Sequence, residues 1–158
     1  MRASAARTLA AALACGVIAA FAPPAVSAAD AQAATAADAK PGPRDWTAIR
    51  KVIGDQRTAL RKDDGARAFA FATRELRAQF GSVENFMRMV HAGYQPLIDA
   101  RYVEFLEGAV VDGSVIQPLR LVLADGNVLV ALYTMQKEDD GRWRIAGCML
   151  APSTVRAA

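Results

Sequence analysis

Four side chains near the middle of the chain are of types that could carry out acid–base chemistry: His91, Tyr94, Asp99 and Arg101. His91 is the only histidine, and imidazole titrates near neutral pH, so it could act as a general base beside Tyr94 on the same side of a helix. Asp99 could accept a proton, and Arg101 could bind a substrate carboxylate. The structural alternative is that His91 interacts with the carbonyl end of a helix, while Asp99 and Arg101 form an exposed pair or a turn.

A second set of candidates is aromatic. Tyr102, Tyr133 and Trp143 could line a pocket for a hydrophobic ligand, since binding sites are mostly apolar with a few polar groups. The alternative is that most of the large apolar side chains belong to the hydrophobic core, because a domain this small has few other sources of stability. The sequence leaves both possibilities open.

The sequence favours neither a metal site nor a bound cofactor. A single histidine excludes a multi-histidine site, and Asp63-Asp64-Gly65 is typical of a helix cap and a tight turn. The sequence contains no glycine-rich phosphate loop, CxxC pair or nucleophile elbow. We expect Glu138-Asp139-Asp140 to be a solvated hairpin tip, and Cys148 to be a small buried side chain on a strand.

The N-terminal part of the chain has the three features of a cleavable secretory signal. Arg2 and Arg7 form a basic leader, residues 8–21 are apolar and uncharged, and Val26-Ser27-Ala28 offers a cleavage site. We therefore predict a signal peptide over residues 1–28 and an exported protein, periplasmic or secreted, with no transmembrane segment after cleavage. Lipidation at Cys15 is disfavoured, because the preceding residues fit a lipobox poorly and the apolar run continues past the cysteine.

The charge balance gives no support for nucleic-acid binding. The full chain has 19 basic and 16 acidic residues, a formal net charge of +3; removing Arg2 and Arg7 leaves 17 basic against 16 acidic residues, or +1. The basic residues are interspersed with acidic ones and form no basic patch or run. The partners that remain are a small apolar ligand, a partner protein, or a second copy of the chain in a homodimer.

Beyond the signal, the sequence predicts a linker, one domain and a short tail. Residues 29–44 are rich in Ala and Pro and have no large apolar side chain, so we expect a flexible linker there. Residues 45–151 are long enough for a single hydrophobic core and too short for two domains. Residues 152–158 form the C-terminal tail.

The first half of the domain has the pattern of helices. The apolar positions of the first helix recur every three to four residues, at Trp46, Ile49, Ile53 and Leu60. Asp45 is expected to cap this helix, and Asp64 to cap a short one that follows. Further helices are predicted over residues 73–80 and 82–93. Pro96 is expected to keep the next segment from being helical.

From residue 101 the pattern changes to that of β-strands. Four runs rich in β-formers cover residues 101–111, 115–123, 127–136 and 142–150, and each of the three gaps holds an Asp-Gly pair, a strong hairpin signal. Pro118 predicts that the second run is an edge strand or bulged, and Gly147 allows a bend in the last. The predicted fold class is α+β: N-terminal helices packed on a curved, cone-like four-stranded antiparallel meander, with a cavity between the layers.

Several short segments resemble a known family. They are Asp63-Asp64 with residues 68–72, Phe86-Met87 with Met89-Val90, Gly93-Tyr94, and residues 143–145 with Gly147-Cys148. Together they resemble an exported bacterial family of unknown function, and residues 140–145 resemble the final strand of the nuclear transport factor 2-like, or SnoaL-like, cone fold. That superfamily includes isomerases, dehydratases, cyclases and non-enzymatic binding modules, so the resemblance implies a fold rather than an activity.

Because no residue set has catalytic spacing, the sequence favours an exported, non-catalytic module that binds a small molecule or a partner protein. The alternative is a cofactor-independent acid–base enzyme of the isomerase or dehydratase type, acting on a small apolar substrate in the cavity. A polar pair pointing into a closed cavity would favour the enzyme. An exposed apolar patch on the outer face of the sheet would favour a dimerising adaptor.

Overall fold

The computed structural model describes residues 40–153, which lie within one compact unit, Asp38–Ala158. The predicted signal peptide and most of the predicted linker lie outside the described residues, as do residues 154–158. The helices are α2 (Pro43–Arg61), α3 (Gly65–Ala70), α4 (Arg74–Phe80), α5 (Val83–Gly93) and α6 (Gln95–Asp99). The strands are β1 (Tyr102–Phe105), β2 (Ala109–Val111), β3 (Ser114–Val122), β4 (Val128–Lys137) and β5 (Trp143–Pro152).

Helix α2 buries the apolar positions that its spacing predicts, with Ile49 and Ile53 fully buried. The predicted cap is wrong: Gly42 is the N-cap residue, and Pro43 occupies the first turn, where a missing N–H is not needed. Asp45 lies in that turn and accepts a hydrogen bond from the backbone N–H of Gly42 at 3.1 Å. It therefore closes the helix start from inside the helix, as in a capping box.

The next three helices begin at side-chain caps, of which the sequence predicted the cap at Asp64 and the helix start at Ser82. Asp64, Thr73 and Ser82 each accept a hydrogen bond from the backbone N–H three residues on, at 3.1–3.2 Å. The expectation for Pro96 is wrong, because it lies in the first turn of α6. A proline is tolerated there, since the first N–H groups of a helix have no partner within the helix.

The strands form one antiparallel sheet in the order β1-β3-β4-β5, with β2 also paired to β3. The three Asp-Gly turns confirm the predicted meander, and their glycines have φ of 74–80°, a region that favours glycine. The sheet has five strands instead of four, because the first predicted run is interrupted between β1 and β2. At the interruption Gly108 lies against the ring of Trp46, and a Cβ there would come within 2.3 Å of it.

Pro118 does not mark an edge, since β3 has neighbours on both sides. The predicted bulge is present on the β1–β2 side: Phe105 pairs with Leu119 and Ala109 with Ile116, so residues 106–108 lie opposite residues 117–118, while the register with β4 is unbroken. The carbonyl of Pro118 accepts the N–H of Leu106 at 3.1 Å, so its nitrogen faces the same side, opposite the gap between β1 and β2. No strand lies there to accept a hydrogen bond, so the missing N–H of Pro118 leaves no sheet hydrogen bond unmade. A second register shift lies between β4 and β5 at Thr134 and Met135, beside Gly147, where the sequence predicts a bend.

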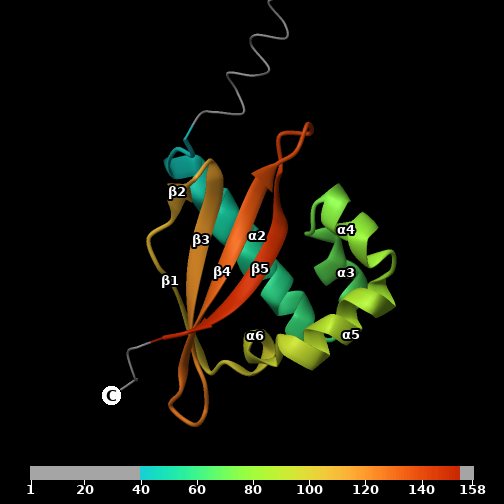
Figure 1. Ribbon diagram of the computed structural model, residues 1–158, viewed down its shortest axis with the longest axis vertical. Helices are drawn as coiled ribbons and strands as arrows, with labels where there is room; N and C mark the ends of the chain where they lie inside the picture. The colour runs from blue at the N-terminus through green and yellow to red at the C-terminus, as the bar shows by residue number, and fades with distance from the viewer. Residues whose placement is uncertain (1–39, 154–158) are drawn as a thin grey trace, which may run out of the picture. The chain divides into compact units, whose positions relative to one another are not determined.

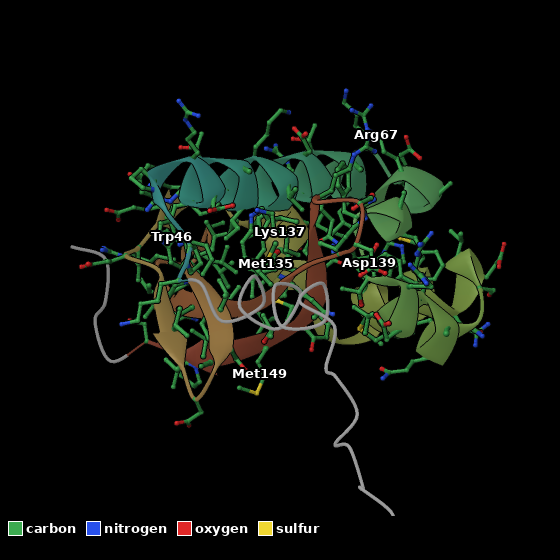
Figure 2. The ribbon with its side chains drawn as sticks, turned by 90° about the horizontal axis from the view of Figure 1, so that it is seen from above. Trp46, Arg67, Met135, Lys137, Asp139 and Met149 are labelled. Atoms are coloured by element: carbon green, nitrogen blue, oxygen red, sulfur yellow. The ribbon has the colours of Figure 1, made fainter. Side chains whose placement is uncertain are left out.

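The fold is α+β, as predicted, with helices on one face of a curved sheet. Helix α2 crosses this face, while α3, α4 and α5 lie together beyond β5 (Figure 1). We call α2 with the sheet face that it covers the packed layer, and residues 65–93 the helical arm. Seen from above, α2 and the sheet form two layers, and Met149 points away from α2 (Figure 2). The centre of the packed layer is sealed, with Ile53, Leu121 and Tyr133 each at 0% exposure.

Candidate functional site

A cavity of about 270 Å³ lies where the helical arm meets the sheet. The arm supplies one wall, through Leu76 and Phe80 of α4 and Met89 of α5. Helix α2 contributes Gln56 and Leu60. The remaining wall comes from α6, the end of α5, and the residues of β5 around the register shift. The predicted cavity between helices and sheet is therefore present, at the β5 edge of the sheet.

The arm is held against β5 at the segment that joins α3 to α4. The N–H of Ile145 donates to the carbonyl of Phe71, and the N–H of Thr73 donates to the carbonyl of Ile145, both at 2.9 Å. These two bonds form an isolated parallel bridge between Ala72 and Ile145. The edge of β5 is thereby paired with the arm at one point, directly next to the cavity.

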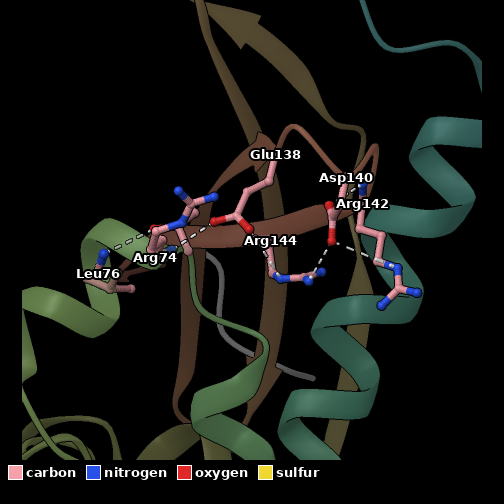
Figure 3. A network of polar contacts seen from close by, with 7 residues as sticks. Arg74, Leu76, Glu138, Asp140, Arg142 and Arg144 are labelled. Carbon is pink, nitrogen blue, oxygen red and sulfur yellow. Dashed lines mark hydrogen bonds and ion pairs between the residues drawn. The ribbon is translucent and has the colours of Figure 1, made fainter.

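A polar cluster at the β4–β5 hairpin supports the same attachment (Figure 3). Glu138 accepts the backbone N–H of Arg74 at 2.8 Å and forms an ion pair with Arg144 at 3.8 Å. Arg144 also donates to Asp140 at 3.1 Å. The expected solvated tip is wrong for Glu138, whose side chain is only 11% exposed. Its carboxylate links the hairpin to the start of α4, a contact between residues 64 positions apart that the local sequence does not reveal.

Within the arm, aromatic rings form the wall of the cavity. Phe86 lies 5.2 Å from Phe69 and 5.6 Å from Phe80, measured between ring centroids. The ring planes of Phe80 and Phe86 are inclined by 78°, an edge-to-face arrangement that aromatic pairs favour. The rings hold α3, α4 and α5 together as a unit while leaving Phe80 facing the cavity.

Two polar groups of the wall come from Tyr94 and Cys148. The Tyr94 hydroxyl donates to the carbonyl oxygen of Cys148 at 2.7 Å, which satisfies an acceptor on the free edge of β5. Burial raises the pKa of the Tyr94 hydroxyl, and burial raises the pKa of the Cys148 thiol to about 12. Both groups are therefore neutral at physiological pH. Cys148 lies partly buried on β5.

Of the four acid–base candidates, only Tyr94 lines the cavity. His91 lies at the end of α5, half exposed, with Nε2 3.4 Å from an Asp63 carboxylate oxygen. Asp99 is exposed and accepts a hydrogen bond from Gln95 at 3.1 Å. Arg101 is exposed, and its backbone N–H donates to Val122 at the start of the sheet. The fold therefore does not gather these four side chains into one constellation.

The three aromatic candidates also lie away from the cavity wall. Tyr102 is 59% exposed on the outer face of the sheet. Tyr133 is fully buried in the packed layer, where its hydroxyl lies close to the Cys148 thiol, a weak partner; burial raises the pKa of the hydroxyl well above the usual value. Trp143 is 8% exposed, and its Nε1 donates to Asp45 at 2.8 Å, so it closes the packed layer at the start of α2.

The residues that do line the cavity were mostly missed from the sequence, where they have the pattern of ordinary core positions. One signal was available at Gln56. It follows Ile53 by three residues and precedes Leu60 by four, so it is a polar side chain within the apolar stripe of α2. A polar residue in such a stripe indicates a buried hydrogen bond or a site, and Gln56 is 5% exposed.

The part of the chain that the structure describes runs from residue 40 to residue 153. Within that range no three His, Cys, Asp or Glu side chains come together in a way that could hold a metal ion. None of the helices in that range has both the length and the apolar character needed to cross a membrane.

These observations define a small α+β domain with an apolar cavity at the open edge of its sheet. The family model of the domain of unknown function DUF4864 matches residues 43–158, and the chain belongs to this family. Comparison with curated proteins found no match, and neither did comparison with solved structures.

Proposed function

We propose that this protein is an exported, non-catalytic binding module whose cavity beside β5 holds a small apolar ligand. The observation that carries the proposal is the wall of that cavity. Leu60, Leu76, Phe80 and Met89 converge on about 270 Å³ of space, with only a few polar atoms among them. A concave apolar site with a few polar groups is the usual form of a small-molecule site, although this one is at the small end of the range.

The absence of catalysis in this proposal rests on the protonation of the cavity wall. Acid–base catalysis near neutral pH needs a group that titrates in that range. Among the described residues that line the cavity, Tyr94 and Cys148 are the titratable ones, and the pKa of each is raised by burial. His91 and Asp99 are exposed, and neither lines the cavity. This arrangement supports binding over the isomerase or dehydratase alternative.

Two finer parts of the proposal rest on the sequence. Export is supported by the basic leader, apolar run and small-residue exit of residues 1–28. Membership of the nuclear transport factor 2-like superfamily is supported by the resemblance of the last hairpin and is compatible with helices on one face of a curved sheet. In that case the cavity lies where a cone opens between the two layers.

The test is ligand capture. Protein exported by a bacterial host is examined by native mass spectrometry, and its cavity is titrated with the neutral apolar dye N-phenylnaphthylamine, followed by fluorescence. We expect saturable binding that is abolished by Leu76→Trp, because the larger ring fills the cavity. Ala48→Trp, on the exposed side of α2, is the control and should bind like the original chain, since Ala48 is exposed and does not line the cavity. Equal loss or equal retention in both variants would contradict the cavity as the binding site.

A second candidate function is self-association through the outer face of the sheet. Three of the exposed large apolar side chains, Tyr102, Val111 and Met149, lie on this face by their strand register, at 59%, 53% and 63% exposure. Strand spacing and rise give the face an area of roughly 400–600 Å². A monomeric protein rarely exposes a contiguous apolar patch larger than this. A standard protein–protein interface buries about 800 Å² per partner.

A second copy of the chain is the partner that this face fits best. The face carries the ion pair between Glu104 and Arg120, at 3.0 Å. In a two-fold dimer, Glu104 of one copy could pair with Arg120 of the other, and the reverse. Sedimentation velocity at micromolar concentration should show a dimer that Met149→Asp converts to monomer. Gln79→Asp, an exposed change on α4, is the control. A monomer at every concentration would exclude this function and leave the cavity proposal untouched.

A further inference from the structure

The cavity wall is uncharged as well as apolar. Among the described residues that line it there is no Asp, Glu, Lys, Arg or His. A charged group placed against this wall loses part of its hydration and finds no opposite charge there. The chemistry of the wall therefore selects against carboxylates, phosphates and ammonium groups, and the selectivity among neutral ligands depends on the few polar atoms.

Gln56 presents one of these polar atoms. Its Nε2 donates to the backbone carbonyl of Ala68 at 3.3 Å, and since only the amide nitrogen can donate to a carbonyl, this bond fixes which way the amide points. The other atom, Oε1, has no hydrogen-bond partner within residues 40–153. Oε1 also keeps some accessible surface, whereas the hydroxyl of Tyr133 is completely enclosed by protein atoms. Because Gln56 is 5% exposed and lines the cavity, Oε1 is left as an acceptor that faces that space.

Tyr94 adds a second acceptor. Its hydroxyl proton is committed to the carbonyl of Cys148 at 2.7 Å, which leaves the lone pairs of the phenolic oxygen free. Cys148 itself contributes a neutral thiol, a weak donor and weak acceptor. The strong, unused hydrogen-bonding capacity of these side chains therefore consists of the oxygen acceptors on Gln56 and Tyr94 and the second N–H of the Gln56 amide. The two oxygens call for a donor on the ligand.

We propose that the ligand of this cavity is a neutral, mainly apolar molecule with a hydroxyl or amide N–H group that donates a hydrogen bond to Oε1 of Gln56. This inference rests on the proposed binding function and specifies its ligand class. A ligand without a donor leaves the buried Gln56 oxygen unpaired, which weakens binding by about tenfold. A site built around a polar atom therefore discriminates against the analogue that lacks the matching group far better than an apolar pocket discriminates by size.

The test compares four ligands with the same chain: octanol, octyl methyl ether, octanoate and octylammonium. Dissociation constants are measured with the full chain by displacement of N-phenylnaphthylamine, and checked by calorimetry. We expect octanol to bind about tenfold more tightly than the ether, in line with one unpaired acceptor. Both ions should bind more weakly than the ether. The ether is the matched control, because it keeps the oxygen and the chain but has no donor.

The variant Gln56→Met assigns the preference to one atom. Methionine has a similar length and no hydrogen-bonding amide, so the ratio between octanol and ether should fall to about one while the ether still binds. Tyr94→Phe, which removes the second acceptor and keeps the ring, should reduce the ratio less. If Gln56→Met does not fold, as judged by circular dichroism, the ranking of the four ligands with the original chain still decides the question.

The outcomes separate the two proposals. Equal binding of octanol and ether, or tightest binding of octanoate or octylammonium, would overturn the ligand class and leave a binding cavity in place. A ratio that Gln56→Met leaves unchanged would likewise overturn the role of Gln56. Failure of all four ligands and of the dye to bind would overturn the proposed function itself.

Discussion

The packed layer and the helical arm of this protein are built in different ways. In the packed layer, Ile49 and Ile53 of α2 and Leu121 of the sheet are all fully buried. In the arm, α4 contributes no buried residue, and its apolar side chains Leu76 and Phe80 border a cavity. The arm is attached by backbone bonds at Ile145 and by Glu138 rather than by filling the space next to it. Stability therefore resides in the layer, and room for a ligand resides at the arm.

The largest expected effect distinguishes the two regions directly. Ile53→Ala should lower the free energy of unfolding by about 3–4 kcal/mol, because it deletes buried carbons and leaves a cavity in a sealed layer. Leu76→Ala deletes the same number of carbons at a wall that is already open, so about 1 kcal/mol is expected. Urea denaturation followed by circular dichroism measures both. Equal losses would show that the arm is packed as tightly as the layer.

A smaller effect is expected where the sheet closes on the start of α2. Gly108→Ala places a Cβ within 2.3 Å of the Trp46 ring, so the ring or the strand must shift, at about 1–3 kcal/mol. Gly54→Ala is the control, because a Cβ there meets nothing within 4 Å and α2 is helical at this point. It should be neutral or stabilising. Thermal unfolding of the two variants in parallel checks the difference, and a neutral Gly108→Ala would mean that Trp46 is not packed as described.

The same end of the packed layer should be sensitive to acid. Hydrogen bonds from Trp143 and Gly42, with help from Lys137, hold the pKa of Asp45 below its ordinary value of 3.8. A depressed carboxylate pKa contributes stability that is present above the unfolded pKa and is lost as the pH falls through the folded pKa. Asp45→Asn should therefore lower the free energy of unfolding by about 1 kcal/mol at pH 7. It should have no effect at a pH below both the folded and the unfolded pKa of Asp45.

Urea midpoints of Asp45→Asn and the original chain, compared from pH 7 downward, test this prediction. Asp139→Asn, an exposed change at the hairpin tip, serves as the control and should show no pH-dependent difference. A deficit in Asp45→Asn that persists unchanged at low pH would argue against a role for the charge.

The smallest global effect is expected at the attachment of the arm. Glu138→Gln removes the ion pair with Arg144 and weakens the acceptor for the N–H of Arg74, so unfolding should change by under about 1 kcal/mol. Amide hydrogen exchange in α4 should nevertheless become faster, because local opening of the arm is separate from global unfolding. Exchange measured by mass spectrometry at the peptide level distinguishes the two. Faster exchange in α2 as well would show that the arm and the layer open together.

Much of the fold follows from local patterns in the sequence. The Asp-Gly pairs specify three hairpins, and Asp64, Thr73 and Ser82 each begin a helix, because turns and caps depend on residues only a few positions apart. Much less of the candidate site could be predicted from the sequence. Of the seven candidate side chains, Tyr94 is the one at the cavity, because a side chain of suitable chemistry says little about which space it faces.

The sequence by itself determined the fold class, the antiparallel meander and the positions of α3, α4 and α5, but not the start of α2 or the presence of α6. Tertiary structure alone decided where β1 ends, since that depends on Gly108 meeting Trp46 across 62 positions of sequence. It also decided that Glu138 anchors α4 and that Gln56 faces a cavity. The physical reason is range: caps, turns and periodicity are interactions between near neighbours, whereas a cavity is the space left between elements, and its walls come from segments that the chain keeps far apart.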